Sequence, residues 1–250
     1  MDTKLLFEKA KEAGISEIEV YRQKITNSEI GIFNHQVETL NSSTSDVCYI
    51  RGAYNGHLGS LYLENNNLSM DEIISTIKEN ATLININEPY FIYPGDEVYP
   101  ELKEFEGDFS EHTLAEKTEL VLALAKRIEE LNEFVKCPEA SYSESSFEYV
   151  IENSNGLNVS KKGGYAFLVG EVLAKKNEEV KSGYDLQLVK KYAEFDVEKL
   201  ANDAVNDTVG KFGAEPIKSG TYKTVVKNSV IRSLLSAFSS VFTAEALIRK

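Results

Sequence analysis

The sequence predicts an α+β fold, in which a twisted, mainly antiparallel sheet packs against several helices and a second, β-rich domain begins near the C-terminus. Two long stretches, 15–63 and 140–189, are rich in β-branched and aromatic residues and contain turn-forming residues at intervals. Segments with apolar residues at helical spacing precede, separate and follow these stretches. We therefore expect an N-terminal α+β domain over 1–218 and the start of a C-terminal domain, which looks truncated, over 219–250.

The first helix is expected over 3–13, with Asp2 or Thr3 as its N-cap and Gly14 ending it in a left-handed conformation. The strand-rich stretch that follows has turn signals at three places, Thr26-Asn27-Ser28, Asn41-Ser42-Ser43 and Asn55-Gly56. These signals predict an antiparallel meander of four or five strands between 15 and 63.

A second helix is expected over 69–84, because Ser69 and Glu72 have the spacing of a capping box and precede apolar residues at helical spacing. The next segment, about 87–112, is acidic, contains Pro89, Pro94 and Pro100, and shows no sustained period. It is typical of a connector that aromatic side chains hold on the surface. The aromatic residues expected to do so are Phe91, Tyr93 and Phe105.

A third helix is predicted over 113–136 from a second capping box, Thr113 and Glu116, and a fourth over 196–210. Strands are expected between these helices, over 140–151, 157–159, 165–174 and 184–189, with a turn at 153–156. They form a second sheet region or extend the first. Gly163-Gly164 is expected in a turn or bulge.

The last part of the chain combines a short β-rich run, 221–227, with an amphipathic helix over 228–247. The apolar stripe of that helix needs a cover, and little chain follows it. We therefore expect these residues to be one part of a longer polypeptide, and the isolated chain to be dimeric or prone to aggregate. The stripe contains Ile231, Leu234, Leu235, Phe238, Val241 and Phe242.

Composition and charge exclude several classes of protein. The chain is 42% apolar and carries 27 basic and 40 acidic residues, for a net charge of -13. No dense basic stretch could follow a phosphate backbone, so no direct nucleic-acid binding is expected. No window approaches the roughly 18 apolar residues of a membrane span, and the N-terminus does not resemble a signal peptide. We expect a cytoplasmic protein without membrane contact, whose two cysteines, Cys48 and Cys137, are free thiols.

Catalytic and metal-ligating residues are scarce. The three histidines, His35, His57 and His112, lie far apart in the sequence, and none belongs to a metal-ligand pair. No G-x-S-x-G elbow is present, and Gly163-Gly164 lacks the strand-loop-helix context of a phosphate-binding loop. A pair of catalytic carboxylates cannot be chosen from 40 acidic residues by sequence. The residues by themselves therefore indicate no catalytic, cofactor-binding or metal-binding residue in this chain.

Three segments resemble the TldD/PmbA family, whose members include TldE and are also known as candidate modulators of DNA gyrase. In order, they are Tyr49-Ile50-Arg51-Gly52-Ala53-Tyr54-Asn55-Gly56-His57-Leu58-Gly59, Asn153-Ser154-Asn155-Gly156 and Ser219-Gly220-Thr221-Tyr222-Lys223-Thr224-Val225-Val226. The resemblance implies a cytoplasmic metalloprotease system in which two related chains, TldD and TldE, assemble. It also implies a further β-rich domain after the last helix.

In TldD-type chains, the helix after the third segment carries an HExxxH zinc motif. The comparable stretch here is Leu234-Leu235-Ser236-Ala237-Phe238-Ser239-Ser240-Val241, and no histidine follows His112. The chain thus resembles the PmbA/TldE type, the subunit without the metal, and zinc is expected only in a TldD-like partner.

The resemblance implies a partner subunit that, with a TldD-like paralogue, encloses a chamber for unfolded peptides. A homo- or hetero-oligomer is expected, in which this chain is not catalytic alone. Two alternatives stay open at the level of sequence. One is a stand-alone binding or regulatory module that contacts a toxin or gyrase, and the other is an unrelated hydrolase that uses carboxylates alone.

Overall fold

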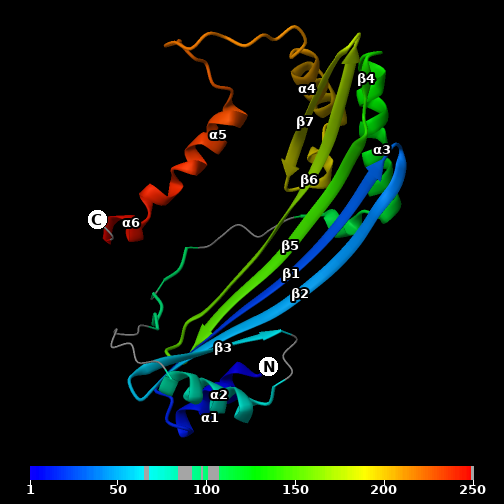
Figure 1. Cartoon of the computed structure of the whole chain (residues 1–250). Coiled ribbons are helices and arrows are strands. Elements are labelled where there is room, and N and C mark those ends of the chain that lie inside the picture. The colour runs from blue at the N-terminus through cyan, green and yellow to red at the C-terminus, as the bar shows by residue number, and fades with distance from the viewer. Residues whose placement is uncertain (65–67, 84–91, 97, 101–106, 249–250) are drawn as a thin grey trace. The chain divides into compact units, whose positions relative to one another are not determined.

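The structure is a computed structural model that describes residues 1–64, 68–83, 92–96, 98–100 and 107–248, the side chain of Ser229 excepted. It divides into two units, Met1–Phe212 and Gly213–Lys250. The first unit contains a sheet whose strands run between two pairs of helices (Figure 1). The α+β class predicted from the sequence is confirmed.

The described strands form one seven-stranded antiparallel sheet in the order β3-β2-β1-β5-β6-β4, with β7 also paired to β6. The second strand-rich stretch therefore extends the first sheet. The strand bounds are β1 Glu17–Phe33, β2 Gln36–Tyr54, β3 His57–Glu64, β4 Val135–Lys136, β5 Glu139–Asn153, β6 Asn158–Lys176 and β7 Glu179–Val189.

The predicted meander of four or five strands is wrong, because residues 15–63 form three strands, two of them very long. The expected turns at 26–28 and 41–43 lie opposite each other inside β1 and β2, where Thr26 pairs with Thr44 and Ser28 with Ser42. The real turn is Asn34-His35, where both residues adopt positive φ, of 47° and 63°. Small polar residues also occur in strands that are exposed to water on both faces, so their presence alone does not indicate a turn.

The Asn55-Gly56 and 153–156 turns are confirmed, but Gly163-Gly164 lies inside β6. The expected strands 157–159 and 165–174 are thus one strand. Gly163 pairs with Phe147 of β5, whose ring fills the space that a side chain at Gly163 would need. The absence of a side chain at Gly163 leaves space for the Phe147 ring, and the backbone of β6 continues without a turn.

The helices of the first unit agree closely with the predicted ones. Their bounds are α1 Thr3–Glu12, α2 Met70–Leu83, α3 Leu114–Leu131 and α4 Val197–Val209, with short 3-10 turns η1 Phe109–Glu111 and η2 Tyr192–Glu194. Asp2 caps α1, and Ser69 with Glu72 and Thr113 with Glu116 form the two expected capping boxes. The third helix ends five residues earlier than predicted, because the Asn132 side chain accepts a hydrogen bond from the Phe134 N–H and the chain turns into β4.

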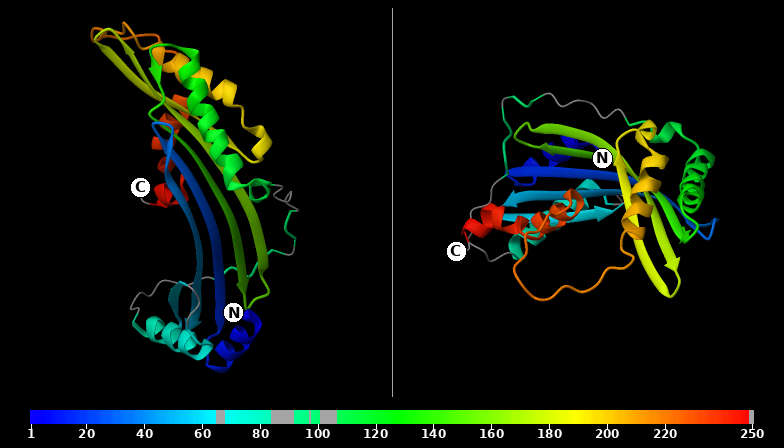
Figure 2. Two further views of the ribbon diagram at one scale, coloured as in Figure 1. Left: turned by 90° about the vertical axis from the view of Figure 1, so that its right-hand side faces the viewer. Right: turned by 90° about the horizontal axis from the view of Figure 1, so that it is seen from above.

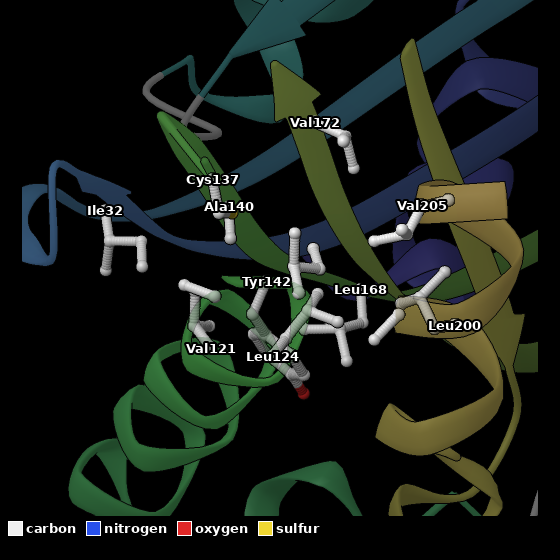
Figure 3. Packing of buried hydrophobic residues seen from close by; sticks show 14 of the residues in the cluster. Ile32, Val121, Leu124, Cys137, Ala140, Tyr142, Leu168, Val172, Leu200 and Val205 are labelled. Carbon is white, nitrogen blue, oxygen red and sulfur yellow. The ribbon is translucent and has the colours of Figure 1, made fainter. Parts of the chain in front are cut away.

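Two hydrophobic clusters lie at opposite ends of the long strands. Figure 2 shows the two helix pairs that cover these ends. At one end α1 and α2 pack on β1–β3 around Ile18, Val20 and Ile50, and at the other α3 and α4 pack on β1, β5 and β6. Figure 3 shows Val121 and Leu124 of α3 facing Tyr142 and Leu168 of the sheet in the second cluster. The middle of the sheet, between the two helix pairs, contributes to neither cluster.

Part of the predicted connector at 87–112 lies outside the described residues, and Phe91 and Phe105 belong to that part. Of the described part, Ile92 and Phe109 are buried. Tyr93 is partly exposed, and its carbonyl oxygen accepts a hydrogen bond from the Asn153 side chain at 2.6 Å. The connector is therefore attached at that point through the main chain of Tyr93.

The second unit differs from its prediction in two respects. Residues 221–227 pair with no strand among those described, and the expected helix 228–247 is divided into α5 Asn228–Ala237, η3 Ser239–Phe242 and α6 Ala244–Ile248. Five of the six apolar side chains of the expected stripe are exposed, with Leu234 at 50%, Phe238 at 56% and Phe242 at 84%, and Ile231 is half-buried.

Candidate functional site

Both helix pairs of the first unit pack on the same face of the sheet. Ile18 and Val20 of β1 enter one cluster, and Ile30 and Ile32 of the same strand enter the other. All four have even residue numbers, and alternate residues of a strand point to the same face of the sheet. We call the part of this face that lies between the helix pairs, formed by the central residues of β1, β5 and β6, the trough.

The floor of the trough is polar and contains two hollows. One, of about 300 Å³, is lined by side chains that include Lys24, Glu148 and Lys162. The other, of about 180 Å³, is lined by Glu144, Phe109 and several hydroxyl-bearing residues. Thr26 and Ser146 belong to both hollows, which are therefore contiguous. Such a lining offers hydrogen bonds and both signs of charge to a polar ligand.

A buried charge network closes the end of the trough nearest α3. Lys117 of α3 is 7% exposed, and its Nζ lies 3.0 and 2.8 Å from the two carboxylate oxygens of Glu144. The hydroxyl of the fully buried Tyr142 donates to the same carboxylate at 2.5 Å. Burial, together with this bond to Glu144, raises the pKa of Tyr142, so the phenol stays protonated as the donor.

None of these three residues was predicted from the sequence as a site residue, although the sequence contains a signal for one of them. Lys117 occupies the same helical face as Val121, Leu124 and Ile128, which are buried. A lone cation on an apolar stripe predicts a buried partner, because an unpaired charge is costly in the interior. The identity of that partner, Glu144 on β5, depends on how the helix meets the sheet.

The three histidines lie on different parts of the fold. His35 occupies the β1–β2 turn, where its Nε2 lies 3.3 Å from Glu129, and His57 begins β3. His112 stacks on Tyr192 with ring centroids 3.8 Å apart. Within the described parts of the chain, no group of three or more His, Cys, Asp or Glu side chains is arranged to hold a metal ion.

Both cysteines are free and buried, in different clusters. Burial, with Glu129 nearby, raises the pKa of Cys137 to about 12, and its thiol donates to the carbonyl oxygen of Glu139 at 3.3 Å. Burial likewise raises the pKa of Cys48. A thiol held protonated is a poor nucleophile, so both cysteines act as packing residues.

Another hollow, of about 670 Å³, lies between α1 and α2. An ion pair crosses it from Lys9 to Asp71 at 2.9 Å, and Lys78 reaches from α2 to the carbonyl oxygen of Ala13 at 3.0 Å. The Lys78 ammonium also lies 4.6 Å from the centroid of the Tyr54 ring. These contacts join the two helices across the hollow.

The segments that carry the family resemblance have structural roles in the first unit. Arg51 pairs with Glu19 across β1 and β2 at 2.8 Å. Asn153 accepts hydrogen bonds from the N–H groups of Asn155 and Leu157, which shapes the β5–β6 turn. The segments 49–59 and 153–156 therefore stabilise the end of the sheet that α1 and α2 cover.

Comparison with family models identifies the chain. Residues 107–212 match the model of the PmbA/TldA metallopeptidase central domain, and residues 18–82 match domain 1 of the same family. The chain belongs to the PmbA/TldD family. The resemblance found in its sequence is therefore confirmed, and the boundary between the two matched domains falls near the connector. No curated protein sequence matches this PmbA/TldD chain.

Three solved structures share the fold of this PmbA/TldD chain. A candidate modulator of a DNA gyrase from Thermotoga maritima has a TM-score of 0.79 at 18% identity, over 87% of this chain and 49% of that one. TldE from Thermococcus kodakarensis has a TM-score of 0.70 at 19% identity, over 82% and 46%. A candidate modulator of DNA gyrase from Bacteroides thetaiotaomicron has a TM-score of 0.81 at 19% identity, over 98% and 57%.

This PmbA/TldD chain therefore spans about half the length of the structures that it resembles. Among its described helices, none is both long and apolar enough to cross a membrane.

Proposed function

We propose that this chain is a PmbA/TldE-type partner subunit of a cytoplasmic TldD/TldE metalloprotease complex that acts on unfolded peptides. The observation that carries the proposal is the match of both family domains in a chain whose sequence has no histidine after His112. The chain then contributes structure and peptide contacts, while the zinc and the hydrolysis belong to a TldD-like paralogue.

The residues at the expected zinc position do not fit the metal. An HExxxH motif supplies two imidazole ligands and a glutamate that can activate the metal-bound water. The stretch Leu234–Val241 has only serine hydroxyls as polar side-chain groups, and hydroxyls are not among the ligands that zinc prefers. We therefore assign no catalytic, cofactor-binding or metal-binding residue to this chain.

Two features of the structure support a role in assembly around peptides. The trough between the helix pairs is polar and accessible, as a wall that faces varied peptides should be. The second unit exposes Leu234, Phe238 and Phe242, and large exposed apolar groups mark contact surfaces. A TldD-like partner that covers such side chains would gain about 1.5–3 kcal/mol for each one fully buried.

The test is to prepare the chain alone, a TldD-like chain alone, and the two together. We measure mass by light scattering, zinc by mass spectrometry and hydrolysis of an unfolded peptide. We expect a complex that contains zinc and cleaves the peptide, with neither zinc nor cleavage from this chain alone. Stoichiometric zinc and proteolysis by the isolated chain would overturn the proposal.

A further comparison separates the proposal from a regulatory role. Affinity capture from a cell extract should recover a TldD-like chain with the tagged protein. Recovery of a basic nucleic-acid enzyme in its place would favour the regulatory role, since the net charge of -13 would complement such a partner.

A further inference from the structure

The outer edge of β2 is only partly paired. Strand β3 lies along β2 from Val47 to Tyr54, and its last residue, Glu64, stands opposite Val47. Beyond that point, β2 continues to Gln36 with β1 on its inner side and no strand among the described residues on its outer side. Figure 1 shows β3 beside one end of β2 only.

The unpaired edge is regular over eight residues. Thr39–Asp46 pairs with β1 in an unbroken register, from Gly31↔Thr39 to Lys24↔Asp46, and the bulge next to Thr39 leaves Glu38 unpaired. In an antiparallel strand, alternate residues direct both the N–H and the C=O to the same side. Since no described strand pairs with the outer side of Thr39–Asp46, that side presents a row of main-chain donors and acceptors to which no described strand is bonded.

Side chains do little to block this edge. Proteins usually protect exposed edges with lysine, proline, bulges or short strands. Residues 36–50 contain no lysine, arginine or proline, and the bulge lies at one end only. The side chains from Asn41 to Ser45 are small, polar and exposed. A peptide main chain can approach without displacing a large group.

We propose that the edge Thr39–Asp46 of β2 binds an extended peptide segment as an additional strand, in line with β3. Binding of this kind uses main-chain hydrogen bonds, and the small side chains of the edge select little sequence. This inference rests on the proposed function, because it makes the β2 edge the place where this subunit holds an unfolded peptide.

Charge favours a peptide over a second copy of the chain. The edge carries Glu38 and Asp46 and no cation of its own, although Arg22 lies 3.8 Å from Asp46. Edge-to-edge pairing of two copies would bring together four acids from two chains that each have a net charge of -13. A neutral or basic peptide meets no such repulsion, so the edge favours peptides of that charge.

The first test uses the full chain and a labelled ten-residue peptide of alternating Thr and Val with a lysine at each end. A second peptide carries N-methyl groups on two adjacent central residues, which blocks both edges of the peptide strand. A third replaces two Val by Ile, which adds the same two carbons and keeps every N–H. We expect fluorescence anisotropy to show that the first and third peptides bind. The N-methylated peptide should bind at least about tenfold more weakly than the first.

The second test locates the site. Hydrogen exchange should slow within 39–46 when the peptide is added. The variant Ser43→Lys/Ser45→Lys should bind the lysine-flanked peptide at least about fivefold more weakly. The matched control, Ser182→Lys/Tyr184→Lys on the edge strand β7, should bind as the unmodified chain does.

Three results would overturn the inference. The first is that the N-methylated peptide binds as tightly as the unmethylated one. The second is that the peptide slows hydrogen exchange only outside 39–46. The third is that exchange at 39–46 becomes slower as the protein concentration increases in the absence of peptide. The last would make a second copy the occupant, and sedimentation would show the dimer. Loss of complex formation with a TldD-like chain, with peptide binding at 39–46 intact, would instead defeat the proposed function alone.

Discussion

Gly59 of β3 lies directly against the main chain of Ile77 in α2. A Cβ atom at Gly59 would overlap the carbonyl oxygen of Ile77 and come within 2.8 Å of the Ala81 nitrogen. The helix can approach the strand this closely only because no side chain separates them. This contact sets the packing distance at the end of the sheet that α1 and α2 cover.

We predict that Gly59→Ala destabilises the chain more than Gly163→Ala does. The added methyl at Gly59 meets helix backbone, which cannot move without shifting α2, so about 3 kcal/mol of unfolding free energy should be lost. At Gly163 it meets the end of the Phe147 ring, which can swing aside, and the loss should be about 1 kcal/mol. Urea unfolding measures both, and equal losses would contradict the packing described here.

The buried Lys117–Glu144 pair gives a second prediction. Lys117→Met should lower the free energy of unfolding by about 3 kcal/mol, because it leaves the Glu144 carboxylate, which is 17% exposed, without its cation and with the neutral Tyr142 hydroxyl as its donor. The control is Lys117→Met/Glu144→Gln, which removes the charge and keeps an acceptor for Tyr142. This double variant should recover more than half of the loss in urea unfolding. A double variant no more stable than the single one would show that the charge is not the cause.

Glu129 should make stability depend on pH. Burial opposes its charged form, but the Cys137 N–H, His35 and Lys136 outweigh burial and lower the pKa of Glu129 below its usual 4.5. A carboxyl whose pKa is lower in the folded chain stabilises it above the unfolded-state pKa, and the gain disappears as pH falls through the folded-state pKa.

Glu129→Gln should therefore lower stability at pH 7 and make little difference well below pH 4, as urea midpoints at several pH values can measure. Lys126→Gln, on the exposed side of the same helix, serves as the control and should change stability little at any pH. An equal effect of Glu129→Gln at all pH values would contradict this role of the charge.

The two thiols should be unreactive in the folded chain. Both are buried, and the pKa of Cys137 is raised to about 12, so almost no thiolate exists at pH 8. A thiol reagent such as dithionitrobenzoate should label neither cysteine in native buffer and both in 6 M guanidinium chloride. Rapid labelling of either one in the native state would show that its cluster opens.

Local signals predicted most of the helices of the first unit and few of the strand ends. Thr113 with Glu116 and Ser69 with Glu72 specify helix starts through contacts within four residues, and both were found as expected. The polar runs at 26–28 and 41–43 look the same in a turn and in a strand open to water on both faces. Their place inside β1 and β2 depends on pairing partners that local sequence does not name.

The sequence by itself determined the α+β class, the starts of the main helices, the family, and the absence of a histidine after His112. These depend on residue identity and on spacing within a few residues. Only the tertiary structure decided that Lys117 contacts Glu144 and that the Phe147 ring packs over Gly163. It also decided that β2 extends beyond β3, so that no described strand pairs with the outer side of Thr39–Asp46. The reason is physical: such contacts depend on strand register and helix placement, which arise from packing over the whole unit.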